Sequence, residues 1–192
     1  MKWLVRYSSQ DLLYIAIFSA LGLAIKPIVA PLIHLISTPL MVPGGSLAGG
    51  LYMMWITLAV VIVQKPGVGF LVGLVQAVVM LSLGLFASHG AISLISYTMP
   101  GLVADITALL LIRKDTVYAH ILICVFANIT GIIIVSTLFL RLPFIPIVIS
   151  IFIGSFSGII GGLLSYSLFI KLKKYRIIRN NKEPLMNENS PR

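Results

Sequence analysis

One acidic side chain lies deep inside a long apolar stretch of this sequence. Asp105 stands eight residues before Arg113, in a stretch from Ser88 to Arg113 that is long enough to cross a bilayer. At about 1.5 Å of rise per residue, it lies about 12 Å from that end of a helix, still inside the hydrocarbon core. A carboxyl group at this depth predicts a functional site. The alternative is a carboxyl that a neighbouring helix satisfies or that is protonated in place.

Two amide side chains fall at a similar depth in other apolar stretches. Gln76 follows Lys65 by eleven residues, and Asn128 follows Val117 by eleven, so each lies about 16 Å from the same edge of the membrane. They are therefore predicted to meet Asp105 at one level and to bind a ligand with it. The alternative is hydrogen bonding between helices, which averages about 0.6 kcal/mol in a membrane protein.

Aromatic and histidine side chains complete the candidate binding set. Tyr97 lies toward the predicted outer surface from Asp105 and is expected to line a cavity. Trp55 suits stacking on a ring, or equally a place in the core or against lipid. His34 and His89 fall at the predicted outer edge, as ligand contacts or as surface residues. His120 falls at the opposite edge, where a surface position is expected.

These residues do not assemble into a catalytic group. An intramembrane hydrolase needs a nucleophile with a base within hydrogen-bond reach. Ser88, His89 and Asp105 have suitable types, but His89 and Asp105 are sixteen residues apart, about 24 Å along a helix. The sequence also holds no phosphate-binding glycine loop, dinucleotide motif or zinc-ligand cluster. We therefore expect no enzyme activity, no cofactor and no bound metal.

Composition places the whole chain in a membrane. Of 192 residues, 59% are hydrophobic and 10% are charged, against about 25% charged residues in a soluble domain. The predicted fold is an all-α integral membrane bundle, residues 1–172, with six transmembrane helices. The predicted spans are residues 12–26, 44–64, 68–86, 89–112, 117–140 and 146–170. Residues 173–192 are expected to form a basic, disordered cytoplasmic tail.

The segment between the first two spans is rich in proline. It holds Pro27, Pro31, Pro39 and Pro43, which predicts a loop or a partly embedded segment. A signal peptide is the alternative for the apolar run before it. The hydrophobic load of every later segment favours a first span that is retained.

Charge distribution sets the orientation. Twelve of the fourteen Lys and Arg residues lie on one side of a six-span arrangement, and only Lys26 and Arg141 lie on the other. Basic residues collect on the cytoplasmic side. We therefore interpret the net charge of +9 as a topology signal with both termini cytoplasmic, and not as a nucleic-acid footprint.

Small residues recur every four positions in two spans, as Ala16, Ala20 and Ala24 and as Gly154, Gly158 and Gly162. Such spacing puts each set on one helix face, where another helix can approach closely. For the alanines, docking of a partner protein and internal packing are both open. For the glycines we expect internal packing.

Taken together, these features resemble the substrate-binding S component of an energy-coupling factor (ECF) vitamin transporter. The six spans, the alanine stripe, and the Lys65-Pro66-Gly67 turn with a downstream acid at Asp105 are similar to the thiamine-related branch. The resemblance covers most of residues 9–172.

The resemblance implies a mechanism. The protein would capture a vitamin-like metabolite, such as thiamine or its pyrimidine precursor, outside a prokaryotic plasma membrane. It would dock through its alanine stripe on a transmembrane coupling subunit served by two cytoplasmic ATPases. Asp105 would pair with a cationic or amino-bearing ring, and Trp55 or Tyr97 would stack on that ring. The alternative is a stand-alone carrier or channel that uses Asp105 as an ion or proton site.

Overall fold

The computed structural model describes residues 7–39, 42–83 and 92–175. The part of the chain that it describes contains helices and no strands. They are α1 (Ser9–Ala24), α2 (Lys26–Ser37), α3 (Gly44–Val63), α4 (Val68–Leu83), α5 (Ile92–Leu110), α6 (Val117–Ile134), the π-helical segment η2 (Val135–Phe139) and α7 (Phe144–Lys174).

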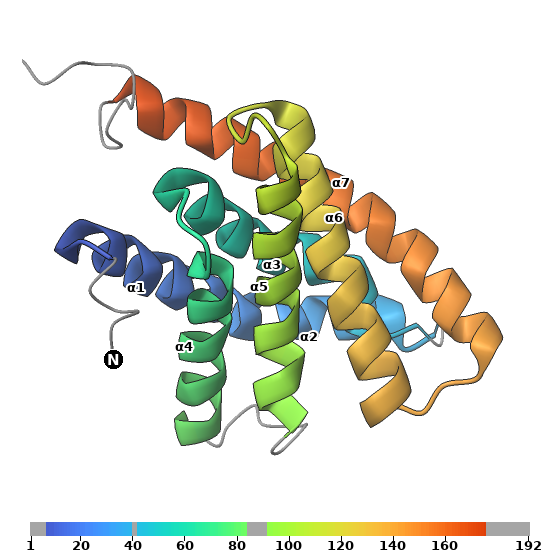
Figure 1. Ribbon diagram of the computed structural model, residues 1–192. Coiled ribbons are helices and arrows are strands. Elements are labelled where there is room, and N and C mark those ends of the chain that lie inside the picture. The colour runs from blue at the N-terminus through green and yellow to red at the C-terminus, as the bar shows by residue number, and fades with distance from the viewer. Residues whose placement is uncertain (1–6, 40–41, 84–91, 176–192) are drawn as a thin grey trace, which may run out of the picture.

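Within those residues, five helical stretches are long and apolar enough to cross a membrane. The first of them, Ser9–Ser37, joins α1 and α2, and α4 is a shorter apolar helix of 16 residues. Counting α4, the molecule is a six-helix membrane bundle (Figure 1). The predicted fold class is therefore confirmed. The predicted tail beyond residue 175 lies outside the described residues.

The proline-rich segment is helical through Ser37, which corrects the expectation of a loop there, while the alternative of a partly embedded segment stays a prediction. Pro27 lies in the first turn of α2, where a missing N–H costs nothing because the first helical N–H groups have no partner inside the helix. Pro31 lies inside the helix. The consequence is that Lys26 stands between two helices, inside an apolar helical stretch of 29 residues.

Glycines set the closest contacts in the bundle. A Cβ added at Gly161 of α7 would clash with the Gly50 carbonyl of α3, and one added at Gly158 would press on Val125 of α6. Gly154 packs in the same way against Ile132. The glycine stripe of α7 therefore packs internally against α6 and α3, as predicted.

A second close crossing joins α4 and α5. A Cβ at Gly69 would clash with the Gly101 carbonyl, and one at Gly101 would clash with the Gly69 carbonyl. The absence of both side chains lets the two backbones touch. This contact brings α5 against the first turn of α4.

The ends of several described helices and the loops between them gather on two sides of the bundle (Figure 1). The start of α1, the turn between α3 and α4, the loop between α5 and α6, and the end of α7 lie toward the upper left of the view. The end of α2, the end of η2 and the start of α7 lie toward the lower right. The first and last described helices thus begin and end on the same side, as an even number of crossings requires.

Candidate functional site

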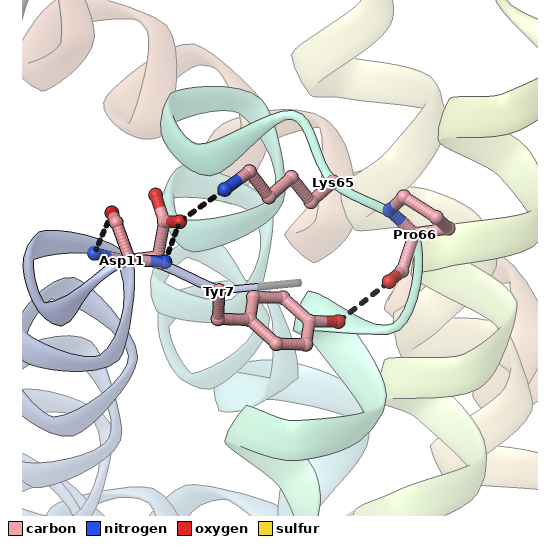
Figure 2. Close-up of polar contacts among 5 residues, drawn as sticks. Tyr7, Asp11, Lys65 and Pro66 are labelled. Carbon is pink, nitrogen blue, oxygen red and sulfur yellow. Dashed lines mark hydrogen bonds and ion pairs between the residues drawn. The ribbon is translucent and has the colours of Figure 1, made fainter. Parts of the chain in front are cut away.

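The turn between α3 and α4 is fastened to the start of α1. Gln64 ends α3 in the left-handed region, with φ of 56°, and Gly67 has φ of 91°. The Lys65 ammonium lies 2.5 Å from the Asp11 carboxylate, and the Tyr7 hydroxyl donates to the Pro66 carbonyl over 2.6 Å (Figure 2). Asp11 also accepts from the Ser8 N–H, closing the N-terminal cap of α1.

Asp105 holds the same turn from the other side. The backbone N–H groups of Gly69 and Phe70 donate to its two carboxylate oxygens, each over 2.9 Å. These N–H groups belong to the first turn of α4, where a helix offers unsatisfied donors and the positive end of its dipole. The carboxylate of α5 therefore caps α4, and its side chain is 7% exposed.

A separate cavity of about 720 Å³ is lined by residues of α2, α3, α4, α5, α6 and η2 and of their connections. This volume is in the range of small-molecule sites. Most of its lining is apolar, including Ile33, Met53, Ile56 and Met80. Its lining also includes charged, aromatic and amide side chains, namely Lys26, His34, Tyr52, Gln76, Tyr97 and Asn128.

Lys26 is the cationic group of this cavity. Its ammonium lies 3.8 Å from the centroid of the Tyr97 ring and 5.5 Å from that of Tyr52. No carboxylate pairs with it among the described residues. Lys26 is half-buried, and a cation on an aromatic face is held by only about 0.5–2 kcal/mol, which compensates in part for the water that the ammonium loses.

Gln76 adds a hydrogen-bond donor that has no acceptor. Its side chain lines the cavity, is 3% exposed, and has no partner for Nε2. Ser46, at the start of α3, lines the same cavity and has a buried hydroxyl without a partner. Buried polar groups are normally hydrogen-bonded, so these two mark places where a ligand or water completes the site.

Exposed lining residues mark the mouth of the cavity. His34 and Thr38 of the α2 end and Phe139 of η2 line it and are exposed. They lie at the end of the bundle where α2 and η2 finish, opposite the α3–α4 turn (Figure 1). Lys26 stands eight residues before His34, about 12 Å deeper along the helix axis.

Four of the predicted binding residues come together here. His34, Gln76, Tyr97 and Asn128 all line the cavity. Asn128 also donates from Nδ2 to the Gly154 carbonyl over 2.7 Å. It therefore forms a hydrogen bond between two helices, as the alternative interpretation expected, and also lines the cavity.

The other predicted residues lie elsewhere. Asp105 and Trp55 are not among the lining residues. Trp55 packs on Phe18, with ring centroids 6.4 Å apart, and its indole N–H is buried without a partner. His89 lies outside the described residues. Asp105 thus does not join Gln76 and Asn128 at the cavity, and its ligand role stays a prediction.

The surface position expected for His120 is wrong. The side chain is fully buried between α6 and α7, with Nδ1 2.8 Å from the Ser165 hydroxyl. Its ring also lies against Tyr166 and Phe169. Tyr166, Phe169 and Ser165 of α7 cover the imidazole near the start of α6, and depth along the chain does not reveal such a contact between helices.

Sequence reasoning missed Lys26 and Tyr52. Lys26 was assigned to the outer loop because the prolines after it suggested the end of the helix. The available signal was that it is the one charged residue between Leu12 and Ile36. If that run is treated as one helical stretch, Lys26 falls near its middle.

The alanine stripe of α1 does not pack inside the bundle. Ala16, Ala20 and Ala24 are all exposed, and the neighbouring Leu13 and Ile17 are 58% and 43% exposed. Within the part of the chain that the structure describes, no helix covers these alanines, which favours the docking alternative over internal packing. Docking of a partner on this face stays a prediction.

The fold and the cavity together define a multi-pass α-helical membrane protein with an internal site of small-molecule size. Residues 10–130, more than half of the chain, match the family described as "ABC-type cobalt transport system, permease component". The chain belongs to this family, and it is a membrane component of an ABC-type transporter. No curated protein and no solved structure matches the chain.

This match corrects the resemblance to a thiamine-related S component, which is wrong. The family found is that of a cobalt transport permease component. The turn with its downstream acid misled because Asp105 caps α4 at that turn. An intramembrane acid with such a structural partner carries no information about a vitamin.

Proposed function

We propose that this protein binds a small organic solute in the cavity beside Lys26 and passes it across the membrane as part of an ABC-type transporter. The observation that carries the proposal is the cavity itself, about 720 Å³ with an apolar lining and a few polar groups. That combination is typical of small-molecule sites. The family membership supplies the transport context.

The chemistry of the cavity favours an organic solute over a bare metal ion. The family description names cobalt, but a divalent cation would meet the ammonium of Lys26 and a largely apolar wall. The Lys26 ammonium repels Co²⁺, and an apolar wall provides no ligands to replace the water molecules around that ion. The same surfaces suit a molecule with an apolar body and a polar group.

The proposed direction is import. The ends of α2 and η2, which carry the exposed lining residues, lie opposite the α3–α4 turn, the α5–α6 loop and the basic end of α7 (Figure 1). Since basic residues favour the cytoplasmic side, the mouth faces outward. The proposed location is the cell membrane, with both termini in the cytoplasm. With Lys26 placed in the cavity, Arg141 is the basic residue left at the outer end.

The proposed partners are a second transmembrane subunit and cytoplasmic ATPases. The sequence itself carries no nucleotide motif, so ATP hydrolysis must come from other chains. The exposed face of Ala16, Ala20 and Ala24 is the proposed contact for the transmembrane subunit, because small residues let a second helix approach closely.

The first experiment identifies what the cavity holds. The protein is purified in mild detergent and the released small molecules are measured by mass spectrometry. Ala30 lines the cavity, whereas Leu32 of the same helix is 61% exposed and does not. We expect Ala30→Trp to fill the cavity and abolish a stoichiometric compound that the wild type and Leu32→Trp retain. Equal amounts of that compound in both variants would refute the cavity as the site.

The second experiment tests the energy source. Uptake of the identified compound is measured in vesicles with and without co-expressed ATPases of the same transporter class. We expect uptake to require both ATP and the ATPases. Uptake by this chain alone would favour the stand-alone carrier instead.

A further inference from the structure

We propose that the solute carries an anionic oxygen group, a carboxylate or a phosphate, which binds Lys26 and Gln76 in the deep part of the cavity. The inference rests on the proposed function, since it names the chemical class of the solute for that same site. It follows from three observations on the lining.

The first observation is the unpaired charge. The Lys26 ammonium lies on the faces of Tyr97 and Tyr52, at 3.8 and 5.5 Å from the ring centroids. The cavity lining contains no Asp or Glu among the described residues. An ammonium in a largely apolar cavity is stabilised most by an anion with which it forms a charge-assisted hydrogen bond.

The second observation is a neighbouring donor without an acceptor. Gln76 Nε2 has no partner and lies against Gly22 of α1. Gly22 and Lys26 lie on either side of the junction between α1 and α2, four residues apart, and Gln76 and Lys26 both line the cavity. The orphaned amide N–H and the ammonium therefore belong to the same region of the cavity, and both need an acceptor.

The third observation is the positive end of a helix dipole in the cavity wall. The N-terminus of α3, with Gly44, Gly45 and Ser46, lines the cavity and has no side-chain cap. The positive end of a helix dipole favours negative charge. Gly44 lies beside His34, toward the mouth, so the cavity attracts anions along its length as well as at its deep end.

The apolar lining indicates the chemical character of the rest of the solute. Ile33, Met53, Ile56 and Met80 surround the polar groups. A free inorganic ion would leave this surface unfilled. The solute is therefore an organic anion with one charged end.

The test uses small probes in matched pairs on the purified protein. Benzoate is compared with benzamide, and phenyl phosphate with phenol. Inorganic phosphate and cobalt(II) chloride are included as ions without an apolar body. Binding is measured by titration calorimetry and by the shift in unfolding temperature, for the wild type, Lys26→Met and Lys26→Arg.

We expect at least one anionic probe to bind at least 30-fold more tightly than its neutral partner. This preference should vanish in Lys26→Met, since that variant removes the charge with which the anionic group pairs, and should survive in Lys26→Arg. Arginine keeps the charge, so it also serves as the variant that distinguishes lost binding from lost folding. The carboxylate and phosphate pairs show which anionic group the site prefers.

Other outcomes separate the two proposals. Equal binding of the anionic and neutral probes, unaffected by Lys26→Met, would overturn the anion inference while leaving the cavity as a solute site. Binding that persists in Ala30→Trp would refute the cavity itself. Tight binding of cobalt(II) in preference to every organic probe would overturn both.

Discussion

Two polar regions of the bundle differ in how their charged side chains are paired. At the α3–α4 turn, Lys65 pairs with Asp11, and the Asp105 carboxylate accepts from Gly69 and Phe70. In the cavity, Lys26 lies on two aromatic rings with no carboxylate partner among the described residues.

The comparison shows that depth alone does not identify a functional charge. Asp105 is buried and satisfied, so its desolvation is offset by protein groups and it contributes to stability. Lys26 is half-buried and has no carboxylate partner among the described residues, so the cost of its partial desolvation is offset only in part by the two aromatic rings. A group retained at such a cost is the better candidate for binding, because a ligand supplies the missing partner.

The largest expected effect comes from the close crossing beneath the turn. Gly101→Ala would drive a methyl group into the Gly69 backbone, and we expect a loss of about 1–3 kcal/mol or more of stability because neither helix can yield there. Gly45→Ala is the matched control at the cavity mouth, where no atom lies within 4 Å of an added Cβ. Thermal unfolding in detergent measures both, and equal losses would contradict the assigned packing.

The next effect comes from the cap itself. Asp105→Asn keeps the shape of the side chain but offers one acceptor where two N–H groups donate. We expect it to destabilise the protein by about 1.5–3 kcal/mol, the range for hydrogen bonds to a charged group. Unfolding temperature is the measure. An unchanged temperature would mean that the carboxylate does not hold α4.

A smaller effect is expected at the α1 contact. Lys65 is 38% exposed in its pair with Asp11, and exposed pairs contribute about 0–1 kcal/mol. Lys65→Met should therefore lower stability by less than 1 kcal/mol, and high salt should have the same weak effect on the wild type. A loss as large as that of Asp105→Asn would show that the turn depends mainly on α1.

The smallest effect on the isolated protein is expected on the exposed face of α1. Ala20→Leu should leave stability and solute binding unchanged, because Ala20 is exposed. It should nevertheless weaken association with the proposed transmembrane subunit, measured by co-purification. Leu13→Ala, on the same helix, is the control for a general loss of surface area. Full association of Ala20→Leu would place the contact elsewhere.

Much of the fold was predictable because long apolar runs permit little besides helices in a membrane. Apolar runs indicated helices where α3 to α7 lie, and the glycine stripe of α7 correctly indicated internal packing. The helix after Lys26 was not predicted, because proline was treated as a break although the first turn of a helix tolerates it. The residues of the cavity were partly predicted, as His34, Gln76, Tyr97 and Asn128.

Depth along the chain pointed to Asp105 as the binding charge, whereas the charged side chain that lines the cavity is Lys26. Which helix supplies the partner of a buried charge depends on the packing of α4 against α5 and of α2 against α3. That information lies in contacts between distant residues. Spacing along one helix does not contain it.

The most direct test of this account compares Lys26→Met with Asp105→Asn for the amount of co-purified solute per folded molecule, measured by mass spectrometry. The account predicts that Lys26→Met folds with normal stability and loses the solute. It predicts that Asp105→Asn unfolds at a lower temperature and keeps the solute in its folded fraction. The reverse pattern, with solute lost in Asp105→Asn and kept in Lys26→Met, would contradict the assignment of the binding charge to Lys26.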